Sequence, residues 1–210
     1  MAKKSADFEK NVFINCPFDN LYSDLFNAIV FTIHDTGFRP RCALEANNAG
    51  QNRLEKLLNI ISNCKYSIHD LSRIQLDKST KLPRFNMPFE LGLDLGCKNF
   101  GNIHQRQKVI LIMDSEPYRY QKFISDLAGH DISPHSNNER KLITTVRNWF
   151  NLEIDSHVTI VPSGEMIFDR YQDFKNSLPI ICKKLNWNLN DLPYVDFSYC
   201  VAEWIAQNSI

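Results

Sequence analysis

The chain has 210 residues, of which 43% are hydrophobic and 23% charged, and 24 Lys and Arg residues balance 24 Asp and Glu residues to a net charge of zero. Proteins that bind nucleic acid by neutralising its phosphates carry a basic excess, so this balance argues against direct nucleic-acid binding. The hydrophobic content excludes an intrinsically disordered chain. The length fits one domain of roughly 150 residues with an extension.

The N-terminal residues and the cysteines indicate the compartment. The segment MAKKSADFEK is polar, so we expect no secretory signal peptide. The longest apolar runs, such as Val109–Met113, have the length of a strand and are too short to cross a bilayer. The six cysteines include no CxxC pair. We therefore expect reduced thiols in a cytoplasmic protein with no membrane contact and no metal site.

Short apolar runs alternate with segments of helical periodicity in the first half of the chain. The predicted strands are 11–15, 38–44, 65–69 and 108–114, and the predicted helices between them are 21–36, 48–64 and 88–97. Such alternation is typical of α/β proteins, in which helices cover both faces of a parallel sheet. We therefore predict a three-layer open parallel sheet of the flavodoxin type.

The pattern becomes less regular after Glu116. We predict helices at 118–128, 139–150, 167–185 (interrupted by Pro179) and 195–207, a loop at 130–138, and a short strand or connector at 158–161. We place a boundary near residue 155, between an α/β nucleotide-binding domain (1–155) and a helical C-terminal extension (156–210) packed on it. The aromatic residues of the extension either cap one face of the domain or form a self-association surface.

The residues that follow each predicted strand are candidates for a binding site, because open parallel sheets bind ligands beyond the carboxyl ends of their strands. The first strand leads into Asn15, Cys16, Pro17 and Phe18. Polar side chains and free backbone N–H groups before a helix suit a phosphate or a ribose. An ordinary turn capped by Asp19 or Asn20 is the alternative. The segment lacks the glycines of a dinucleotide-binding loop and the lysine of a P-loop.

Polar groups also follow the second and third strands. Arg39 and Arg41 either grip a phosphate or ribose or form an ordinary ion pair with Glu45. The third strand leads into His69, Asp70 and Ser72. Asp70 is placed to bind ribose hydroxyls, whereas His69 either titrates at a site or is a satisfied residue of the sheet.

The segment from Arg84 to Gly96 carries the most informative residue, Glu90. Asn86 precedes a predicted helix that opens toward the expected site, and Glu90 lies in the first turn of that helix. A carboxylate among Phe, Leu and Pro side chains can have a raised pKa and can stabilise a cationic sugar carbon. The alternative is that Glu90 only complements the positive end of its helix.

The motif of Ile68–Ser72, then Asn86–Gly96 with its Phe-Glu-Leu-Gly core, then the strand at 108–114 resembles a known arrangement. It is similar to that of bacterial Toll/interleukin receptor (TIR)-like nucleotide-binding proteins and of nucleoside 2-deoxyribosyltransferase-like proteins. The opening Val12–Pro17 resembles the first TIR strand, with Asn15 in place of a serine. The resemblance covers roughly residues 11 to 115.

The resemblance implies that Glu90 is the catalytic carboxylate and that Asn15, Pro17 and Phe18 line a nucleotide pocket. It favours an NAD⁺ glycohydrolase that cleaves the nicotinamide–ribose bond, uses NAD as substrate without a further cofactor, assembles as a homo-oligomer and acts in bacterial anti-phage defence. In this hypothesis Arg39, Arg41 or Arg84 holds the diphosphate, His69 and Asp70 orient the ribose, and Phe18 or Phe85 stacks on a ring.

Two other functions remain open from the sequence. One is a nucleotide-sensing module without turnover, because a fold of this kind does not establish an activity. The other is a nucleoside deoxyribosyltransferase-like enzyme, in which the same carboxylate acts as a covalent nucleophile.

Overall fold

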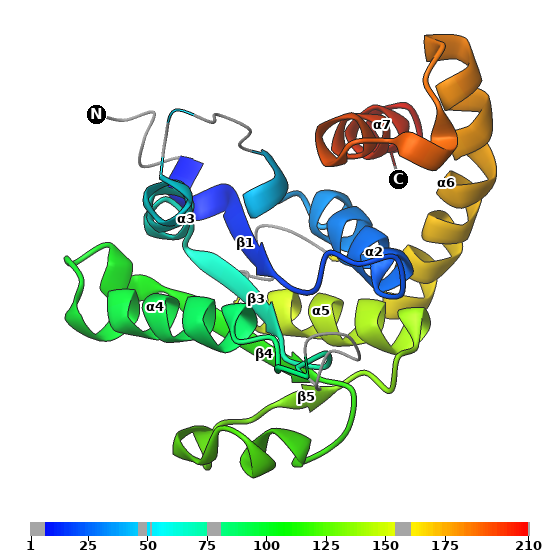
Figure 1. Ribbon diagram of the computed structural model, residues 1–210. Helices are drawn as coiled ribbons and strands as arrows, with labels where there is room; N and C mark the ends of the chain where they lie inside the picture. Colours follow the sequence, from blue (N-terminus) through cyan, green and yellow to red (C-terminus); the bar gives the residue numbers. More distant parts are fainter. Residues whose placement is uncertain (1–6, 46–49, 51, 75–80, 154–160, 210) are drawn as a thin grey trace. The chain divides into compact units, whose positions relative to one another are not determined.

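Figure 1 shows a computed structural model of the protein, which describes residues 7–45, 50, 52–74, 81–153 and 161–209. The chain divides into two compact units. The first consists of Met1–Ser23 and Arg41–Asn137, and the second of Asp24–Pro40 and Asn138–Ile210. The predicted boundary at residue 155 lies outside the described residues.

The fold is built on a five-stranded sheet with the order β2-β1-β3-β4-β5. Its strands are β1 (Asn11–Asn15), β2 (Arg39–Cys42), β3 (Tyr66–Asp70), β4 (Val109–Asp114) and β5 (Ser133–Pro134). β1, β3, β4 and β5 pair in parallel, with Ile14 opposite Ile68 and Ile68 opposite Leu111. This is the strand order of flavodoxin-like sheets. The predicted α/β class with an open parallel sheet is confirmed.

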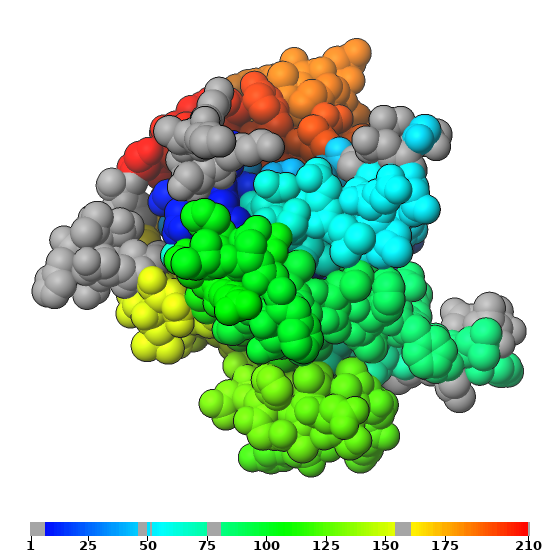
Figure 2. All heavy atoms as spheres, turned by 90° about the vertical axis from the view of Figure 1, so that its left-hand side faces the viewer, coloured from blue at the N-terminus to red at the C-terminus, as the bar shows by residue number. Residues whose placement is uncertain are grey.

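Helices α3 (Arg53–Ser62) and α4 (Asn86–Phe100) lie side by side in the first unit (Figure 2). Asn52 caps α3 by accepting a hydrogen bond from the Leu54 amide at 2.8 Å. The buried face of α3, with Leu57, Ile60 and Ile61, packs on Phe13 of β1 and against α4. These contacts hold the N-terminal turns of both helices near the carboxyl end of β1.

The structure corrects three predicted elements of the first unit. α4 begins at Asn86, two residues before the predicted start. Segment 118–128 forms two short 3-10 turns, Arg119–Lys122 and Ser125–Leu127, instead of one helix. Tyr118 adopts a left-handed backbone conformation (φ 58°), and the Arg119 side chain is bound to Asp114 at 2.8 Å, which prevents a continuous helix. The predicted loop 130–138 contains β5, which is too short to give a periodic signal.

The second unit contains helices α2 (Ser23–Asp35, all but its first residue), α5 (Glu139–Glu153), α6 (Gly164–Leu185) and α7 (Tyr194–Gln207). Phe31 of α2 contacts the rings of Tyr171, Phe174 and Trp204 at centroid distances of 5.3, 5.5 and 5.9 Å. Much of the aromatic content of the C-terminal region is therefore used in packing within this unit.

α6 continues through Pro179, so the predicted interruption is wrong. Phe174 and Cys182, on either side of the proline, are both buried. The free energy gained by burying the helix on both sides of Pro179 therefore compensates for the loss of the one backbone hydrogen bond that proline removes. Residues 158–160 of the predicted connector lie outside the described residues. No helix in the described part of the chain is long and apolar enough to cross a membrane.

Candidate functional site

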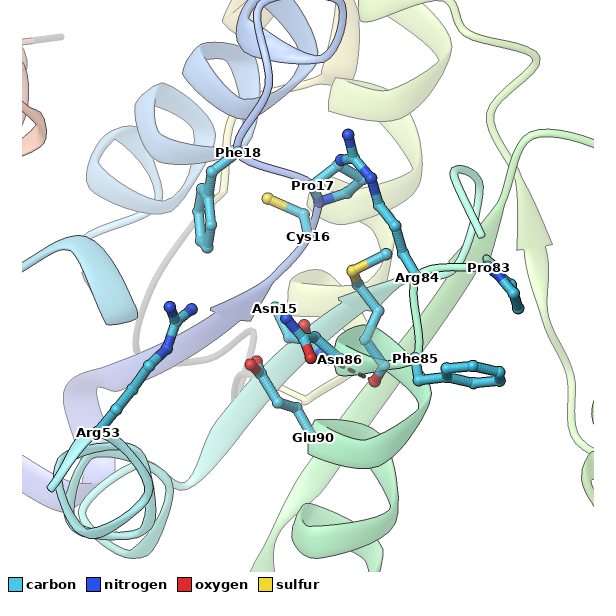
Figure 3. Close-up of a pocket in the computed structure, with 11 residues that line it drawn as sticks. Asn15, Cys16, Pro17, Phe18, Arg53, Pro83, Arg84, Phe85, Asn86 and Glu90 are labelled. Carbon is cyan, nitrogen blue, oxygen red and sulfur yellow. Dashed lines mark hydrogen bonds between the residues drawn. The ribbon is translucent and has the colours of Figure 1, made fainter. Parts of the chain in front are cut away.

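A pocket of about 420 Å³ lies at the carboxyl end of β1, beside the first turn of α4 (Figure 3). The strand order reverses between β1 and β3, which is where flavodoxin-like sheets bind ligands. The volume is in the range of small-molecule sites. The pocket brings together seven of the predicted site residues, namely Asn15, Cys16, Pro17, Phe18, Arg84, Asn86 and Glu90.

Glu90 is the one carboxylate among the described residues that line this pocket. Met87 and Leu91 bury one face of α4 in the core of the unit, which leaves the neighbouring Glu90 at the pocket wall with only 8% of its surface exposed. Burial raises the pKa of Glu90 to about 7, although the charge of Arg53 acts in the opposite direction. Near neutral pH, Glu90 is therefore ionised in about half of the molecules. A carboxylate whose pKa is raised in this way is typical of functional sites.

Replacing Glu90 with glutamine is expected to stabilise the protein at pH 8 and to leave its stability nearly unchanged at pH 4. The folded state binds the Glu90 proton more tightly than the unfolded state, so the wild type loses stability as the pH rises from about 4.5 to about 7. The gain at pH 8 is at most about 3 kcal/mol. Urea unfolding at the two pH values measures it.

Glu55→Gln is the matched control, because Glu55 is exposed on α3. It should change the free energy of unfolding by less than about 0.5 kcal/mol at either pH. A Glu90→Gln variant that is no more stable than the wild type at pH 8 would show that Glu90 is not held in an unfavourable environment.

Asn15 joins the strand to the helix that carries Glu90. It is the last residue of β1 and is 2% exposed. Its side-chain nitrogen donates to the Met87 carbonyl of α4 at 2.8 Å and contacts His69 Nδ1 of β3 at 2.9 Å. The predicted pocket residue Asn15 is therefore also a fixed link between three elements.

Cationic and aromatic side chains surround the pocket. Arg84 donates to Asp19 Oδ2 at 2.6 Å, so its charge is shared with a carboxylate of the loop after β1. Arg53, in the first turn of α3, lies across the pocket from Arg84 (Figure 3). Phe18 and Phe85 are 39% and 66% exposed. Two arginines and two rings are suited to a ligand that carries both phosphate and an aromatic base.

Arg53 was not among the predicted site residues. Its place among the polar residues of the predicted helix 48–64 suggested a solvated surface. The signal that was available is its position: α3 follows β2, so the start of α3 lies near the edge of the sheet where ligands bind. The structure adds Arg53 to the pocket together with Pro83 and Met87, and it also places Phe85, the second predicted stacking residue, in the lining.

A second cavity of about 220 Å³ shares Phe18, Arg53 and Glu90 with the first. Its remaining lining consists of Ala43, Leu44, Lys56, Leu57 and Ile60. The second cavity is thus mostly apolar, whereas the first presents two asparagine amides. Glu90 lies where an apolar compartment and a polar compartment meet.

Several predicted site residues are not in the lining of the pocket. His69, Asp70 and Ser72 are buried, and Arg41 forms an ion pair with Glu45 at 2.6 Å. Arg39 belongs to the second unit, so its contact with a ligand remains a prediction. The direct ribose contacts of His69 and Asp70 likewise find no support in the positions of their side chains.

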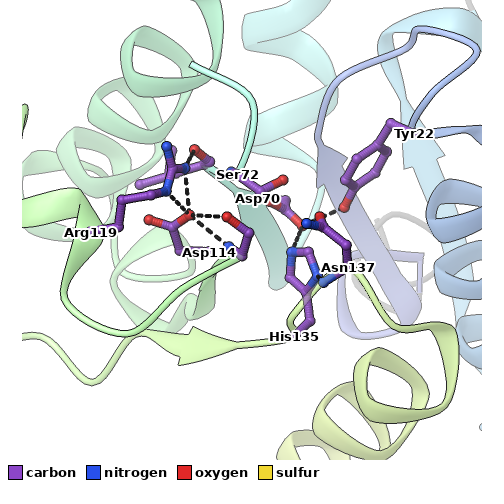
Figure 4. A network of polar contacts seen from close by, with 9 residues as sticks. Tyr22, Asp70, Ser72, Asp114, Arg119, His135 and Asn137 are labelled. Atoms are coloured by element: carbon purple, nitrogen blue, oxygen red, sulfur yellow. Dashed lines mark hydrogen bonds and ion pairs between the residues drawn. The ribbon is translucent and has the colours of Figure 1, made fainter. Parts of the chain in front are cut away.

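Asp70 belongs instead to a buried polar network (Figure 4). Its carboxylate accepts hydrogen bonds from the Tyr22 hydroxyl and, at 2.7 Å, from the Ser72 amide, and it lies 2.9 Å from His135 Nε2. Burial opposes ionisation of Asp70, but His135, Ser72 and Tyr22 together hold its pKa below the ordinary value. His135, which was expected in a loop, is fully buried here. This network joins β3 to the segment after β5.

Cys16 lines the pocket but is not suited to act as a nucleophile. The side chain is 3% exposed, and burial, followed by the charge of Asp70, raises the pKa of its thiol well above the ordinary value. The thiol is therefore protonated at neutral pH, and the thiolate is the reactive form. Within the described ranges, no three His, Cys, Asp or Glu side chains are grouped as metal ligands would be.

Comparisons with known proteins gave no further information on this site. No protein-family model, no curated protein and no solved structure matches the chain. The TIR-like resemblance therefore remains a hypothesis based on the motif residues themselves.

Proposed function

We propose that the protein is an NAD⁺ glycohydrolase that cleaves the bond between nicotinamide and ribose at the pocket of Glu90. The observation that carries the proposal is the position of Glu90, a largely buried carboxylate with a pKa raised to about 7, in a pocket that also contains two amides, two arginines and two rings. A carboxylate suits the sugar carbon of an N-glycosidic bond, and the amides, arginines and rings suit the hydroxyls, the diphosphate and the base of a dinucleotide.

Each group has a role in this reaction. Nicotinamide leaves the positively charged ribosyl linkage as a neutral ring, so little acid assistance is required. The sugar carbon then develops oxocarbenium character, which an ionised Glu90 stabilises electrostatically. Asn15 and Asn86 bind sugar hydroxyls, and Arg53 and Arg84 attract the diphosphate. Water adds to the sugar carbon and loses a proton to the solvent, which completes the hydrolysis.

The apolar cavity that shares Glu90 supports the same assignment. A flat aromatic base fits an apolar compartment, and the sugar and diphosphate fit the polar one. The free cysteines agree with a reducing, cytoplasmic location. Assembly into a homo-oligomer and a role in bacterial anti-phage defence are parts of the proposal that only the TIR-like resemblance supports.

Incubation of the full chain with NAD, followed by chromatography of the products, tests the proposal. We expect nicotinamide to appear together with ADP-ribose or its cyclic form, in equal amounts. Binding of NAD without any product, at several protein concentrations so that assembly is covered, would contradict the enzymatic role and favour a nucleotide sensor. A stable glycosyl adduct on Glu90, detected by mass spectrometry, would favour the transferase.

A further inference from the structure

A chain of buried polar side chains runs from the inside of the first unit to the pocket. Lys108 Nζ lies 2.9 Å from Asp94 Oδ1, and Asp94 Oδ2 lies 2.9 Å from His69 Nε2. His69 Nδ1 lies 2.9 Å from the side-chain nitrogen of Asn15. The side chains of Lys108, Asp94 and His69 have no exposed surface, so the pocket is reached only at Asn15.

The hydrogen-bond partners determine the orientation of each group in this chain. The Met87 carbonyl can only accept, so the atom of Asn15 that contacts it must be the amide nitrogen. His69 Nδ1 contacts the same nitrogen and must therefore be an acceptor without a proton. The ring hydrogen of His69 is then on Nε2, from which it is donated to Asp94.

The charges of Asp94 and Lys108 also favour a neutral His69 with its hydrogen on Nε2. Asp94 carries one negative charge and Lys108 one positive charge, so a neutral His69 leaves the buried cluster without net charge. A protonated His69 would add an uncompensated charge among fully buried side chains, which is costly. Its Nδ1 hydrogen would also oppose a hydrogen of the Asn15 amide.

We propose that Asp94 and Lys108, acting through His69, position the Asn15 side chain so that its Oδ1 faces the pocket as the acceptor for a sugar hydroxyl of the ligand. Both hydrogens of the Asn15 amide are committed, one to His69 and one to Met87, which leaves Oδ1 for a ligand. The sugar hydroxyl rests on the proposed function, in which the ligand is a ribose-containing nucleotide. His69, Asp94 and Lys108 are positioning residues, because none of them reaches the pocket.

The position of the ring hydrogen of His69, which NMR can measure, tests this proposal directly. In ¹⁵N-labelled wild type, long-range nitrogen–proton NMR spectra should show His69 as the Nε2–H form at neutral pH. In Asp94→Asn a neutral amide replaces the carboxylate and is a weaker acceptor for the Nε2 hydrogen, so the population of this form should fall. A wild-type His69 that is protonated, or that carries its hydrogen on Nδ1, would overturn the proposal. This measurement needs neither ligand nor turnover.

Calorimetry with ADP-ribose and with ADP-deoxyribose tests the role of Asn15. The wild type should bind ADP-ribose about tenfold more tightly than the deoxy compound, the effect of one hydrogen bond. Asn15→Leu and Asp94→Asn should each lose this preference, and the double variant should lose little more than either single variant. Asn99→Leu, at an exposed position of α4, should keep the preference.

The outcomes separate the two proposals. Wild type that binds both compounds equally would overturn the role of Asn15 and leave the glycohydrolase standing. Wild type that binds neither compound but still consumes NAD would overturn the role of Asn15 alone, and wild type that neither binds them nor consumes NAD would overturn both proposals. Additive losses in the double variant would show that Asp94 does not act through Asn15. Thermal melting of each variant establishes that it is folded.

Discussion

Glutamine in place of Glu90 is expected to lower NAD consumption by about 100-fold or more. Glutamine keeps the size of the side chain and can still hydrogen-bond, but it has no negative charge with which to stabilise an oxocarbenium-like transition state. Loss of one preorganised electrostatic group costs about 100-fold to 1,000-fold in rate. Release of nicotinamide, followed by chromatography, measures the effect.

The pH dependence of the wild-type rate tests whether the ionised form of Glu90 is the active one. Because burial raises the pKa of Glu90 to about 7, the rate should fall about tenfold for each pH unit below 7 and level off above it. The control Glu55→Gln should reproduce the wild-type profile. A Glu90→Gln variant as active as the wild type would refute the catalytic role of this residue.

Methionine in place of Lys108 is expected to destabilise the protein by about 3–5 kcal/mol, the cost of leaving a buried charge without its partner. Lys108 is 1% exposed, and its ammonium contacts the carbonyls of Ile61 and Cys64 at 2.8 and 2.5 Å in addition to Asp94. Methionine replaces the apolar stem of lysine up to Cε but has no ammonium, so it supplies none of these hydrogen bonds. Urea unfolding at neutral pH measures the change.

Two further variants distinguish this effect from a general loss of packing. Lys98→Met, at an exposed position of α4, should change stability by less than about 0.5 kcal/mol. Lys108→Met combined with Asp94→Asn should be less destabilised than the sum of the single variants, because the amide removes the unpaired negative charge. Additive effects would show that Lys108 and Asp94 are not coupled.

The elements of the first half of the chain follow from local patterns. The uninterrupted apolar run at 109–113 predicted β4, and the spacing of Leu57 and Ile61 predicted a helix at α3. β5 could not be predicted, because its two residues form a strand only by pairing with Met113 and Asp114 of β4. The 3-10 turns after Tyr118 also depend on a distant partner, since Arg119 donates to the Leu71 carbonyl at 2.7 Å.

The candidate site residues that could be predicted are those that the end of a strand or the start of a helix places at the edge of the sheet. Asn15 follows directly from the rule that ligands lie beyond the carboxyl ends of parallel strands, and Glu90 from its place in the first turn of a helix and from the TIR-like resemblance; both line the pocket. The same rule suggested direct ligand contacts for His69 and Asp70. It gives the edge of the sheet but not the direction of a side chain, and buried partners determine that direction here: Asp94 for His69, and Tyr22 and His135 for Asp70.

The sequence by itself therefore determined the fold class, the succession of the main strands and helices along the chain, and the residues that the backbone brings to one edge of the sheet. These depend on hydrophobic periodicity and on short-range turns, which are local properties of a chain. Only the tertiary structure decided which of those residues reach the pocket and that Arg53 joins them. It also showed that a series of buried contacts links Asn15 to His69, Asp94 and Lys108. The physical reason is that burial, charge pairing and hydrogen bonding join side chains far apart in the sequence.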